Sequence, residues 1–539
     1  MHGQPSHDAV EAARSSLDIG QGHRVAHGGI LADHRPRRAS TGDPGETGEV
    51  TIAEPDSATL DIKAAARLAQ ERVSHSDVPI PSDRRRDIAR PPGPSRLQAL
   101  RGMAAPGAAP WFMVDLERTY PVMAHMRLMG EHAYSLTDPA VIVEVFIDHG
   151  RQTMKGRGLQ GAKAVLGNGL LTSEGDVHLR NRRLVQPAFH RDRIAAYAAD
   201  MVSLAEAHEA SWSEGRALDM QADMAALTLA IVGRTLFGVD LRGDAREVGE
   251  ALEALLSGMG TRLLLGPQVL RIPTPARRRA LEASARMDAM VQRIIDEHRV
   301  MGDNGDMLSM LLAAQEEGVG LDDSQVRDEA MTLVMAGHET TAMTLTWTWM
   351  LLSQHPERAE WLHEELDAVL GGRTPTMEDM ASLPRTRAVI AEAIRLYPPA
   401  WIQGRRLLAD VEVAGWTIPA GALTFASQFA LHRSPRWWES SLAFRPQRWI
   451  GADGTFSEDA PGQPRGAWFP FGWGNRRCIG EQFAWTEATL VLATLAQRWA
   501  PRLVPGADVT PMPAVTLRTR DGMPMVLRRR EDGPGRLTT

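Results

Sequence analysis

Cys478 is the only cysteine of this 539-residue chain, and it lies in a stretch rich in glycine and arginine. The stretch covers residues 471–480 and reads FGWGNRRCIG, and a predicted helix over residues 481–499 follows it directly. A thiol at the N-terminus of a helix lies near backbone N–H donors and the positive end of the helix dipole, and both favour the thiolate. We interpret Cys478 as a thiolate that binds the iron of a haem.

The residues around Cys478 suit such a ligand loop. Gly474 and Gly480 leave space for a flat macrocycle and can adopt positive φ at no steric cost. Phe471 is expected to shield the sulfur from water, and Arg476 to pair with a haem propionate. Two other interpretations of a lone cysteine are a small buried hydrophobic residue and a nucleophile paired with a distant histidine.

The same ten residues match the pattern F-x-x-G-x-R-x-C-x-G at all five fixed positions. In this stretch the chain resembles the cytochrome P450 family of haem-thiolate monooxygenases. The resemblance implies a mostly α fold with small β-sheets, in which haem b lies between a long central helix and the cysteine-ligand loop.

A long helix is predicted over residues 323–354, and its middle contains the polar run AGHETT at residues 336–341. Glycine, an acid and two threonines are costly inside a helix, and a charged residue there argues against a membrane span. We expect the Thr340 hydroxyl to bond the carbonyl of Ala336 and to open the helix locally to a water. Gly337 would leave space for dioxygen and substrate, and Glu339 with Thr340 would deliver protons. The run is similar to a signature of the family.

Glu392 and Arg395 are spaced i, i+3 in a predicted helix, which by itself indicates an ordinary surface ion pair. The segment FRPQRW at residues 444–449 follows where the family places a second arginine. The resemblance therefore implies a buried structural triad of Glu392, Arg395 and Arg448 that holds the chain before the ligand loop.

Three more basic residues are expected to bind the haem propionates. His178 and Arg182 are spaced i, i+4 after a glycine-containing loop, and Arg405 lies in the run QGRR. Arg406 is the alternative to Arg405 if the register differs by one residue.

The resemblance covers residues 91–527, so we predict a haem-thiolate monooxygenase domain over residues 91–539. Residues 1–90 contain no Phe, Trp or Tyr and are rich in Gly, Pro, Ser, Asp, Arg and His. Such a segment buries too little apolar surface to order itself, so we predict a disordered N-terminal extension.

Composition favours a soluble cytoplasmic enzyme. The chain is 43% hydrophobic and 24% charged, carries a net charge of −7, and with one cysteine forms no internal disulfide. We find no signal peptide or membrane anchor. The mild acidity argues against a nucleic-acid partner.

The expected reaction inserts one oxygen atom of O2 into a C–H bond or C=C bond of a hydrophobic small molecule. We find no flavin or nicotinamide signature, so a ferredoxin or flavodoxin with its reductase would supply the electrons. Two alternatives remain, a haem-thiolate enzyme that uses peroxide or isomerises its substrate, and a non-catalytic haem sensor. Neither explains Glu339 and Thr340.

The substrate pocket is expected to be mainly apolar and to suit a fatty acid, terpene or polyketide. A basic anchor for an acyl carboxylate would come from Arg151, Lys155 or Arg157, and the alternative that the sequence favours is a solvated loop. The residues expected to line the pocket are Ala336, Thr340, Ala400, Trp401, Ile402, Ala514 and Val515.

Overall fold

The computed structural model describes residues 88–530 except 106, 129, 245–247, 250–274, 304 and 317–320, together with residues 66, 67, 70–72, 78, 79 and 81. Contacts divide the chain after residue 59, and all described residues belong to the second unit, 60–539. The predicted extension, residues 1–90, therefore lies almost wholly outside the described part of the chain.

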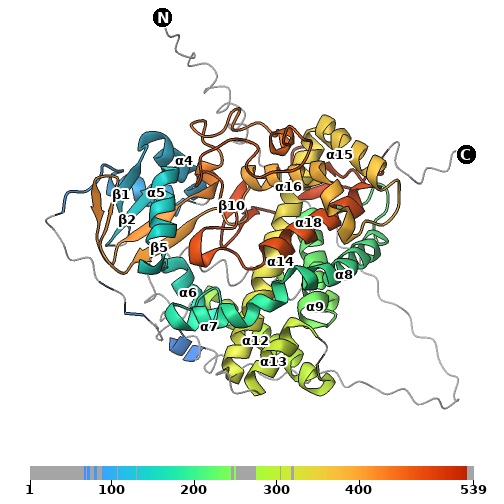
Figure 1. Cartoon of the computed structure of the whole chain (residues 1–539), viewed down its shortest axis with the longest axis horizontal. Coiled ribbons are helices and arrows are strands. Elements are labelled where there is room, and N and C mark those ends of the chain that lie inside the picture. The colour runs from blue at the N-terminus through green and yellow to red at the C-terminus, as the bar shows by residue number, and fades with distance from the viewer. Residues whose placement is uncertain are drawn as a thin grey trace, which may run out of the picture. The chain divides into compact units, whose positions relative to one another are not determined.

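Helices predominate among the described residues, which confirms the expected mostly α architecture (Figure 1). The helices are α3 Arg96–Ala104, α4 Ala109–Thr119, α5 Pro139–Val143, α6 Arg157–Leu166, α7 Gly175–Val185, α8 Arg191–Glu209, α9 Met220–Phe237, α12 Pro275–Met301, α13 Met307–Glu316, α14 Asp323–Gln354, α15 Pro356–Val369, α16 Pro384–Leu396, α17 Gln428–Leu431 and α18 Glu481–Ala496. None of the helices in the described part of the chain is both long enough and apolar enough to cross a membrane.

Strands are short, and they form one five-stranded sheet, one three-stranded sheet and two hairpins within the described residues. The strands are β1 Met123–Leu128, β2 Glu131–Leu136, β3 Thr153–Lys155, β4 Ala217–Asp219, β5 Gln403–Leu407, β6 Val411–Val413, β7 Trp416–Ile418, β8 Leu423–Ala426, β9 Arg502–Leu503, β10 Pro511–Pro513, β11 Leu517–Thr519 and β12 Pro524–Val526. The five-stranded sheet has the order β1-β2-β8-β5-β3, and only the β2–β8 pair is parallel.

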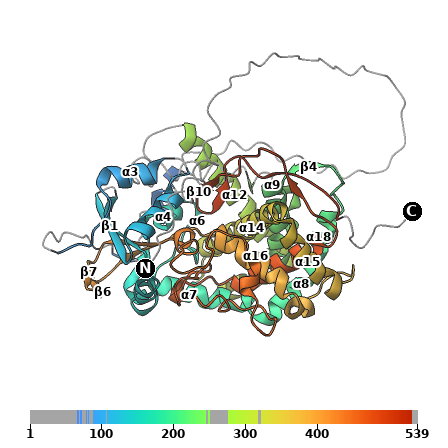
Figure 2. The same ribbon diagram turned by 90° about the horizontal axis from the view of Figure 1, so that it is seen from above.

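Helix α14 is the central helix and has the bounds that the sequence predicts, residues 323–354. The Asp322 side chain caps it by accepting from the Gln325 backbone N–H at 2.8 Å, and Pro356 lies just beyond its end. It packs against α9, α12, α16 and α18, and Figure 2 shows it among these helices. Apolar residues of α14 such as Trp347 and Trp349 are buried in the large hydrophobic core.

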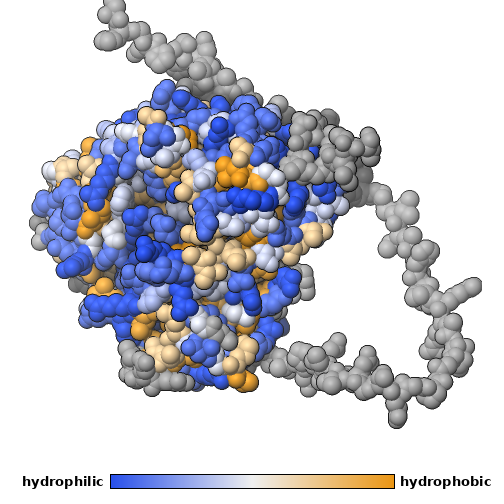
Figure 3. Space-filling view, turned by 45° about the vertical axis from the view of Figure 1, so that its right-hand side comes forward, coloured by the Kyte–Doolittle hydropathy of each residue, from blue (hydrophilic) through white to orange (hydrophobic). Residues whose placement is uncertain are grey.

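Strands β3 and β5 of the sheet and the N-terminus of helix α18 position residues of the candidate site. Strand β3 pairs with β5 so that Lys155 lies opposite Arg405, and directly opposed residues share one face of a sheet. Helix α18 begins three residues after Cys478 and packs against α8, α14 and α16. On the face shown in Figure 3 hydrophilic residues predominate and hydrophobic ones form small separate groups, as expected when the apolar side chains pack inside.

Candidate active site

The cysteine loop is a tight turn that ends at the N-terminus of α18. The Cys478 backbone N–H donates to the Phe471 carbonyl at 2.9 Å, and the Ala484 N–H reaches back to the Gly480 carbonyl at 2.8 Å. Cys478 has accessible surface, although the protein around it is dense enough to perturb its ionisation.

Helix position alone does not make this thiol acidic. Burial raises the pKa of the Cys478 thiol above its ordinary value, while the Gly480 backbone N–H, Arg182 and Lys155 lower it. The expected stabilisation of the thiolate by the helix N-terminus is therefore outweighed by desolvation. A cation bound to the sulfur would reverse this balance, since metal coordination deprotonates a thiol.

Gly474 and Gly480 of the loop differ in their role. Gly474 has a φ of +69°, and a Cβ there would lie 2.6 Å from the Phe146 carbonyl oxygen, so only glycine fits. Gly480 has a φ of −87°, and a Cβ there would make ordinary contact with Phe189 at 3.5 Å. The prediction of positive φ holds for Gly474 and is wrong for Gly480.

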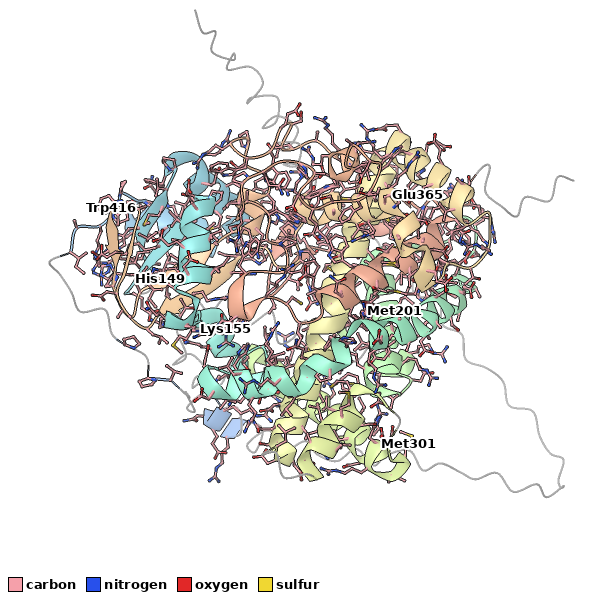
Figure 4. All side chains as sticks on the ribbon, viewed as in Figure 1. His149, Lys155, Met201, Met301, Glu365 and Trp416 are labelled. Atoms are coloured by element: carbon pink, nitrogen blue, oxygen red, sulfur yellow. The ribbon has the colours of Figure 1, made fainter. Side chains whose placement is uncertain are left out.

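Basic side chains gather beside the thiol from four separate parts of the chain. Lys155 is buried between the sheet and the helices α6 and α7 (Figure 4). We call the group the basic cradle, and it consists of Lys155, His178, Arg182, Arg405 and Arg476.

The basic cradle carries an excess of positive charge. Burial and the neighbouring cations lower the pKa of His178 to about 3 and hold that of Lys155 well below its usual value. Burial, with Arg476, lowers the pKa of Arg405 to about 10. Glu174 is the one carboxylate that pairs with the cradle among the described residues, through Arg476. Buried cations require anionic partners, and the two propionates of a haem beside a cysteine ligand fit this requirement.

The structure also distinguishes Arg405 from Arg406. Successive side chains of a strand point to opposite faces, so only one of the two can face the cradle. Arg406 is ion-paired with Glu131 at 2.9 Å and donates to the Gly421 carbonyl at 2.8 Å. Arg405 faces the cradle, as expected, and Arg406 does not.

Sequence reasoning missed two members of this cluster. Lys155 was considered only as an anchor for a substrate carboxylate, but it lies in the basic cradle. Glu174 was not singled out, although it pairs with Arg476 and accepts from the Lys155 backbone N–H at 2.6 Å. The pairing of β3 with β5 places Lys155, and Glu174 lies at the N-terminus of α7. No motif in the sequence indicates that the two meet. Of the other proposed anchors, Arg151 is exposed and the side chain of Arg157 lies outside those described.

Helix α14 has a partly accessible stretch in its polar middle. Ala336, Gly337 and Thr340 keep accessible surface, while the residues from Thr341 to Leu352 are buried. The Thr340 hydroxyl donates to the Ala336 carbonyl at 2.9 Å, which confirms that predicted bond. The helix is continuous there, so the predicted local opening is wrong. A carbonyl has two lone pairs and can accept from the hydroxyl and the helical N–H together.

Glu339 and Gly337 have partners that the sequence did not indicate. The Glu339 carboxylate accepts from the Thr516 hydroxyl and from Arg518 Nε, both at 2.5 Å, and it is buried. It is therefore tied to the β10–β11 hairpin. A Cβ on Gly337 would lie 3.0 Å from Val232 of α9, so this glycine permits close packing of the two helices. The expected space for dioxygen beside it stays a prediction.

The predicted triad forms as expected. Arg395 donates to both oxygens of Glu392 at 2.8 and 2.9 Å, and Arg448 Nε reaches Glu392 at 3.1 Å. Burial raises the pKa of Glu392, but Arg395 and Arg448 more than offset it, so that it falls below its usual value. Trp449, which was not predicted, also donates to Glu392 at 2.9 Å.

The predicted pocket residues come from two adjoining segments and from α14. Trp401 Nε1 donates to the Ala514 carbonyl at 3.2 Å, and the Leu517 N–H donates to the Pro399 carbonyl at 2.9 Å. Thr516, next to Val515, contacts Glu339. The two segments thus meet beside the polar run of α14.

Comparisons with known proteins agree with this geometry. Residues 91–522 match the family model for cytochrome P450. The chain is 39% identical over 402 residues to cyclooctatin synthase from Streptomyces melanosporofaciens, with 73% of this chain and 86% of the relative covered. It is 40% identical over 393 residues to cyclooctat-9-en-7-ol 5-monooxygenase from the same organism, with 72% and 84% covered.

Two further proteins support the assignment. Pentalenene oxygenase from Streptomyces avermitilis is 35% identical over 428 residues, with 77% of this chain and 94% of the relative covered. The crystal structure of the cytochrome P450DA heme domain is similar with a TM-score of 0.72 and 26% identity, covering 83% of this chain and 99% of that one.

A lone thiol at a helix N-terminus with a basic cradle beside it, together with the family match over residues 91–522, defines a haem-thiolate enzyme. The chain belongs to the cytochrome P450 family and is a monooxygenase with a haem-thiolate cofactor.

Proposed function

We propose that this chain is a cytoplasmic monooxygenase that uses Cys478 as its haem ligand and inserts one oxygen atom of O2 into a C–H or C=C bond of a terpenoid. The observation that carries the haem assignment is the basic cradle around the only thiol. Support for the substrate class comes from the relatives, whose names refer to cyclooctatin, cyclooctat-9-en-7-ol and pentalenene.

Bound haem supplies the activation of dioxygen with two electrons and two protons. In our proposal Arg476, Arg405, Lys155, Arg182 and His178 hold its propionates. Phe471, packed against Trp485 with ring centroids 5.9 Å apart, covers the sulfur side. The chain's contribution is to hold the cofactor, exclude water and place a proton donor.

For proton delivery we propose Thr340 and Glu339. The Thr340 hydroxyl lies on the accessible stretch of α14 and can accept a hydrogen bond from water while it donates to Ala336. Arg518 balances the negative charge of Glu339 and holds its carboxylate toward the β10–β11 hairpin. A peroxide-using or isomerising enzyme would not need either residue.

The proposed pocket is apolar apart from this relay. Four of its expected residues are uncharged, namely Ala336, Ile402, Ala514 and Val515. Trp401 donates its indole N–H to the Ala514 carbonyl. Lys155, one of the expected carboxylate anchors, is buried and belongs to the basic cradle. These features favour a hydrocarbon or alcohol scaffold over a free fatty acid.

The test is a spectral titration of the ferric holoenzyme with terpene hydrocarbons and alcohols, alongside fatty acids of similar size. We expect terpenoids to displace the iron-bound water at lower concentrations than the fatty acids do. Tighter binding of the fatty acids would contradict the substrate class without affecting the assignment of Cys478.

We also propose a domain of residues 91–539 preceded by an extension, and a separate ferredoxin or flavodoxin as electron donor. The family match begins at residue 91, which supports this boundary. In the extension, Arg72 lies 3.6 Å from Asp288 of α12, so part of it contacts the enzyme domain.

A further inference from the structure

Glu339, in the polar run of α14, is held by only one of its two carboxylate oxygens. Its Oε1 accepts from the Thr516 hydroxyl and from Arg518 Nε, both at 2.5 Å. Its Oε2 accepts from no group among the described residues. Each carboxylate oxygen has lone pairs for hydrogen-bond donors, so Oε2 is the oxygen that remains free to bind water. We call Thr516 and Arg518 the carboxylate clamp.

The carboxylate clamp is charged and mostly buried. The side chain of Glu339 is 5% exposed and that of Arg518 is 19% exposed, while Thr516 is buried. Arg518 is the one cation that forms an ion pair with Glu339 in the described part of the chain. A buried carboxylate requires such a partner, so the clamp stabilises Glu339 in this position.

The clamp is also fixed by contacts that do not involve Glu339. Leu517, which lies between the two clamp residues, begins β11 and pairs with Pro513 of β10. The Leu517 carbonyl accepts from Trp347 Nε1 of α14 at 3.0 Å, and the Leu517 N–H donates to the Pro399 carbonyl at 2.9 Å. The hairpin therefore sets the position of the clamp, and the clamp sets the position of the carboxylate.

We propose that the carboxylate clamp positions Glu339 for proton delivery: by binding Oε1, Thr516 and Arg518 keep Oε2 free to exchange protons with the water that Thr340 binds. The proposal rests on the proposed role of Glu339 in proton delivery. Oε2 takes up one proton from water for each proton that it passes on, so the carboxyl group is unchanged after a turnover. Thr516 and Arg518 act only through Glu339 and are positioning residues.

The first test replaces Thr516 in the holoenzyme and uses the terpenoid that binds best in the titration as the substrate. Thr516→Val removes the hydroxyl and keeps the shape of the side chain, so the carboxylate loses one of its two bonds. A hydrogen bond to a charged group contributes roughly tenfold or more to an equilibrium, so product per NADPH oxidised should fall by about that factor while peroxide rises. Thr516→Ser keeps a hydroxyl and should retain the native yield.

Two further readouts distinguish positioning from a general loss of structure. The dissociation constant of the terpenoid, measured by spectral titration, should be the same in Thr516→Val and in the native protein. The solvent deuterium isotope effect on product formation should be larger in Thr516→Val, because proton delivery then limits more of the turnover. Weaker binding of the terpenoid with an unchanged isotope effect would contradict the proposal.

Thr519 provides a matched control on the same hairpin. It is also buried, and its hydroxyl donates to Gln221 Oε1 at 2.8 Å and not to Glu339. Thr519→Val should keep the native yield and the native isotope effect. If Thr519→Val lowered the yield as much as Thr516→Val does, the integrity of the hairpin would be responsible, and the proposal would be wrong.

Arg518 is tested against Arg520, which is ion-paired with Asp508 at 3.1 Å on the exposed side of the same hairpin. Arg518→Gln leaves the buried Glu339 without a positive partner, so product per NADPH oxidised should fall at least as much as in Thr516→Val. Arg520→Gln should keep the native yield. A native yield in Arg518→Gln would refute the role of Arg518, and the Thr516 variants decide the proposal if Arg518→Gln does not fold.

A double-mutant cycle separates the clamp from the relay. Glu339→Gln should lower product per NADPH oxidised, and adding Thr516→Val should lower it no further, because Thr516 acts through Glu339. Additive losses would show that Thr516 acts by another route. A low yield in Glu339→Gln with a native yield in Thr516→Val would refute the clamp alone, whereas a native yield in Glu339→Gln would refute both the clamp and the proposed relay.

Thermal unfolding of the ferric holoproteins tests the contact without turnover. Thr516→Val and Glu339→Ala should each lower the unfolding midpoint, and the double variant should lower it by less than the sum, because both changes remove the same hydrogen bond. A decrease equal to the sum would show that Thr516 and Glu339 do not interact in solution, and the clamp would be wrong.

Discussion

Lys155, Arg182, Arg405 and Arg476 bring more positive charge beside Cys478 than Glu174 can balance, whereas His178, with its pKa lowered to about 3, is neutral at pH 7. Without an anion, such a cluster costs free energy, and the depressed pKa of Lys155 records that cost. A dianionic cofactor turns the same cations into favourable partners. At the scale of single residues, we therefore propose that the cradle lowers the stability of the protein without haem and raises its affinity for haem.

Replacing Lys155 tests whether the cradle raises the affinity for haem. Lys155→Met should leave the fold intact, because it removes a buried cation and keeps an apolar chain of similar length. Haem should be lost faster to apomyoglobin, by about 10-fold or more, since a hydrogen bond to a charged group contributes roughly 1.5–3 kcal/mol. Exposed Arg151→Met is the control and should keep the native rate. Equal rates of haem loss in both variants would show that Lys155 does not help to bind the haem.

Some of these residues could be predicted from the sequence and others could not, for a physical reason. Cys478 and Arg476 occur in one short pattern, so their types and spacing suffice to single them out. The triad of Glu392, Arg395 and Arg448 was implied by the family resemblance, because Glu392 and Arg395 alone indicate a surface ion pair. Lys155 depends on the pairing of β3 with β5. The partner of Glu339 depends on where the β10–β11 hairpin lies, and such contacts between distant segments have no local signal.

At the scale of elements, α14 was predicted to its end residues because Asp322 caps one end and Pro356 follows the other. What the sequence could not show is how the helix accommodates its polar middle. Thr340, Thr344, Thr346 and Thr348 each donate to the carbonyl four residues before, so the hydroxyls are satisfied without breaking the helix. Only Thr340 among these four lies on the partly accessible stretch.

This difference among the threonines predicts different effects of the same substitution. Thr340→Ala should retain haem and bind the best terpenoid of the titration, but divert electrons to peroxide because the proton donor is gone. Product per NADPH oxidised should fall by about an order of magnitude or more, in line with the loss of a general acid. Thr346→Ala, which removes a buried hydroxyl with the same kind of bond, is the control. An unchanged yield of product per NADPH oxidised in Thr340→Ala would show that another residue delivers the proton.

At the scale of the whole molecule, we propose that electrons enter near the cysteine loop. Of the arginines close to it in sequence, Arg448 and Arg476 turn inward, and Arg477 is half-exposed but ion-paired with Glu481. Exposed Arg465 stacks on Trp473 with its guanidinium 5.6 Å from the ring centroid. Of these four arginines, Arg465 is therefore the exposed one that forms no ion pair with a carboxylate among the described residues.

A docking surface of this kind predicts that reduction depends on salt. Stopped-flow reduction by an acidic ferredoxin and its reductase should slow as ionic strength rises, because exposed charges are screened within about 8 Å at physiological salt. Arg465→Gln should reduce the slope, and Arg151→Gln, the exposed control, should not. A reduction rate that does not depend on salt would argue against electrostatic docking. Turnover with NADPH and the purified chain alone would contradict the need for a partner.

The central claim is that the sulfur of Cys478 binds the haem iron. The most direct measurement is the absorption spectrum of the reduced carbon monoxide complex of the native protein and of Cys478→Ala. The native protein should show the Soret band shifted to long wavelength that thiolate ligation gives, and the variant should lose that shift because the chain has no second cysteine. A variant that kept the shifted band, or a native holoprotein that lacked it, would contradict the account.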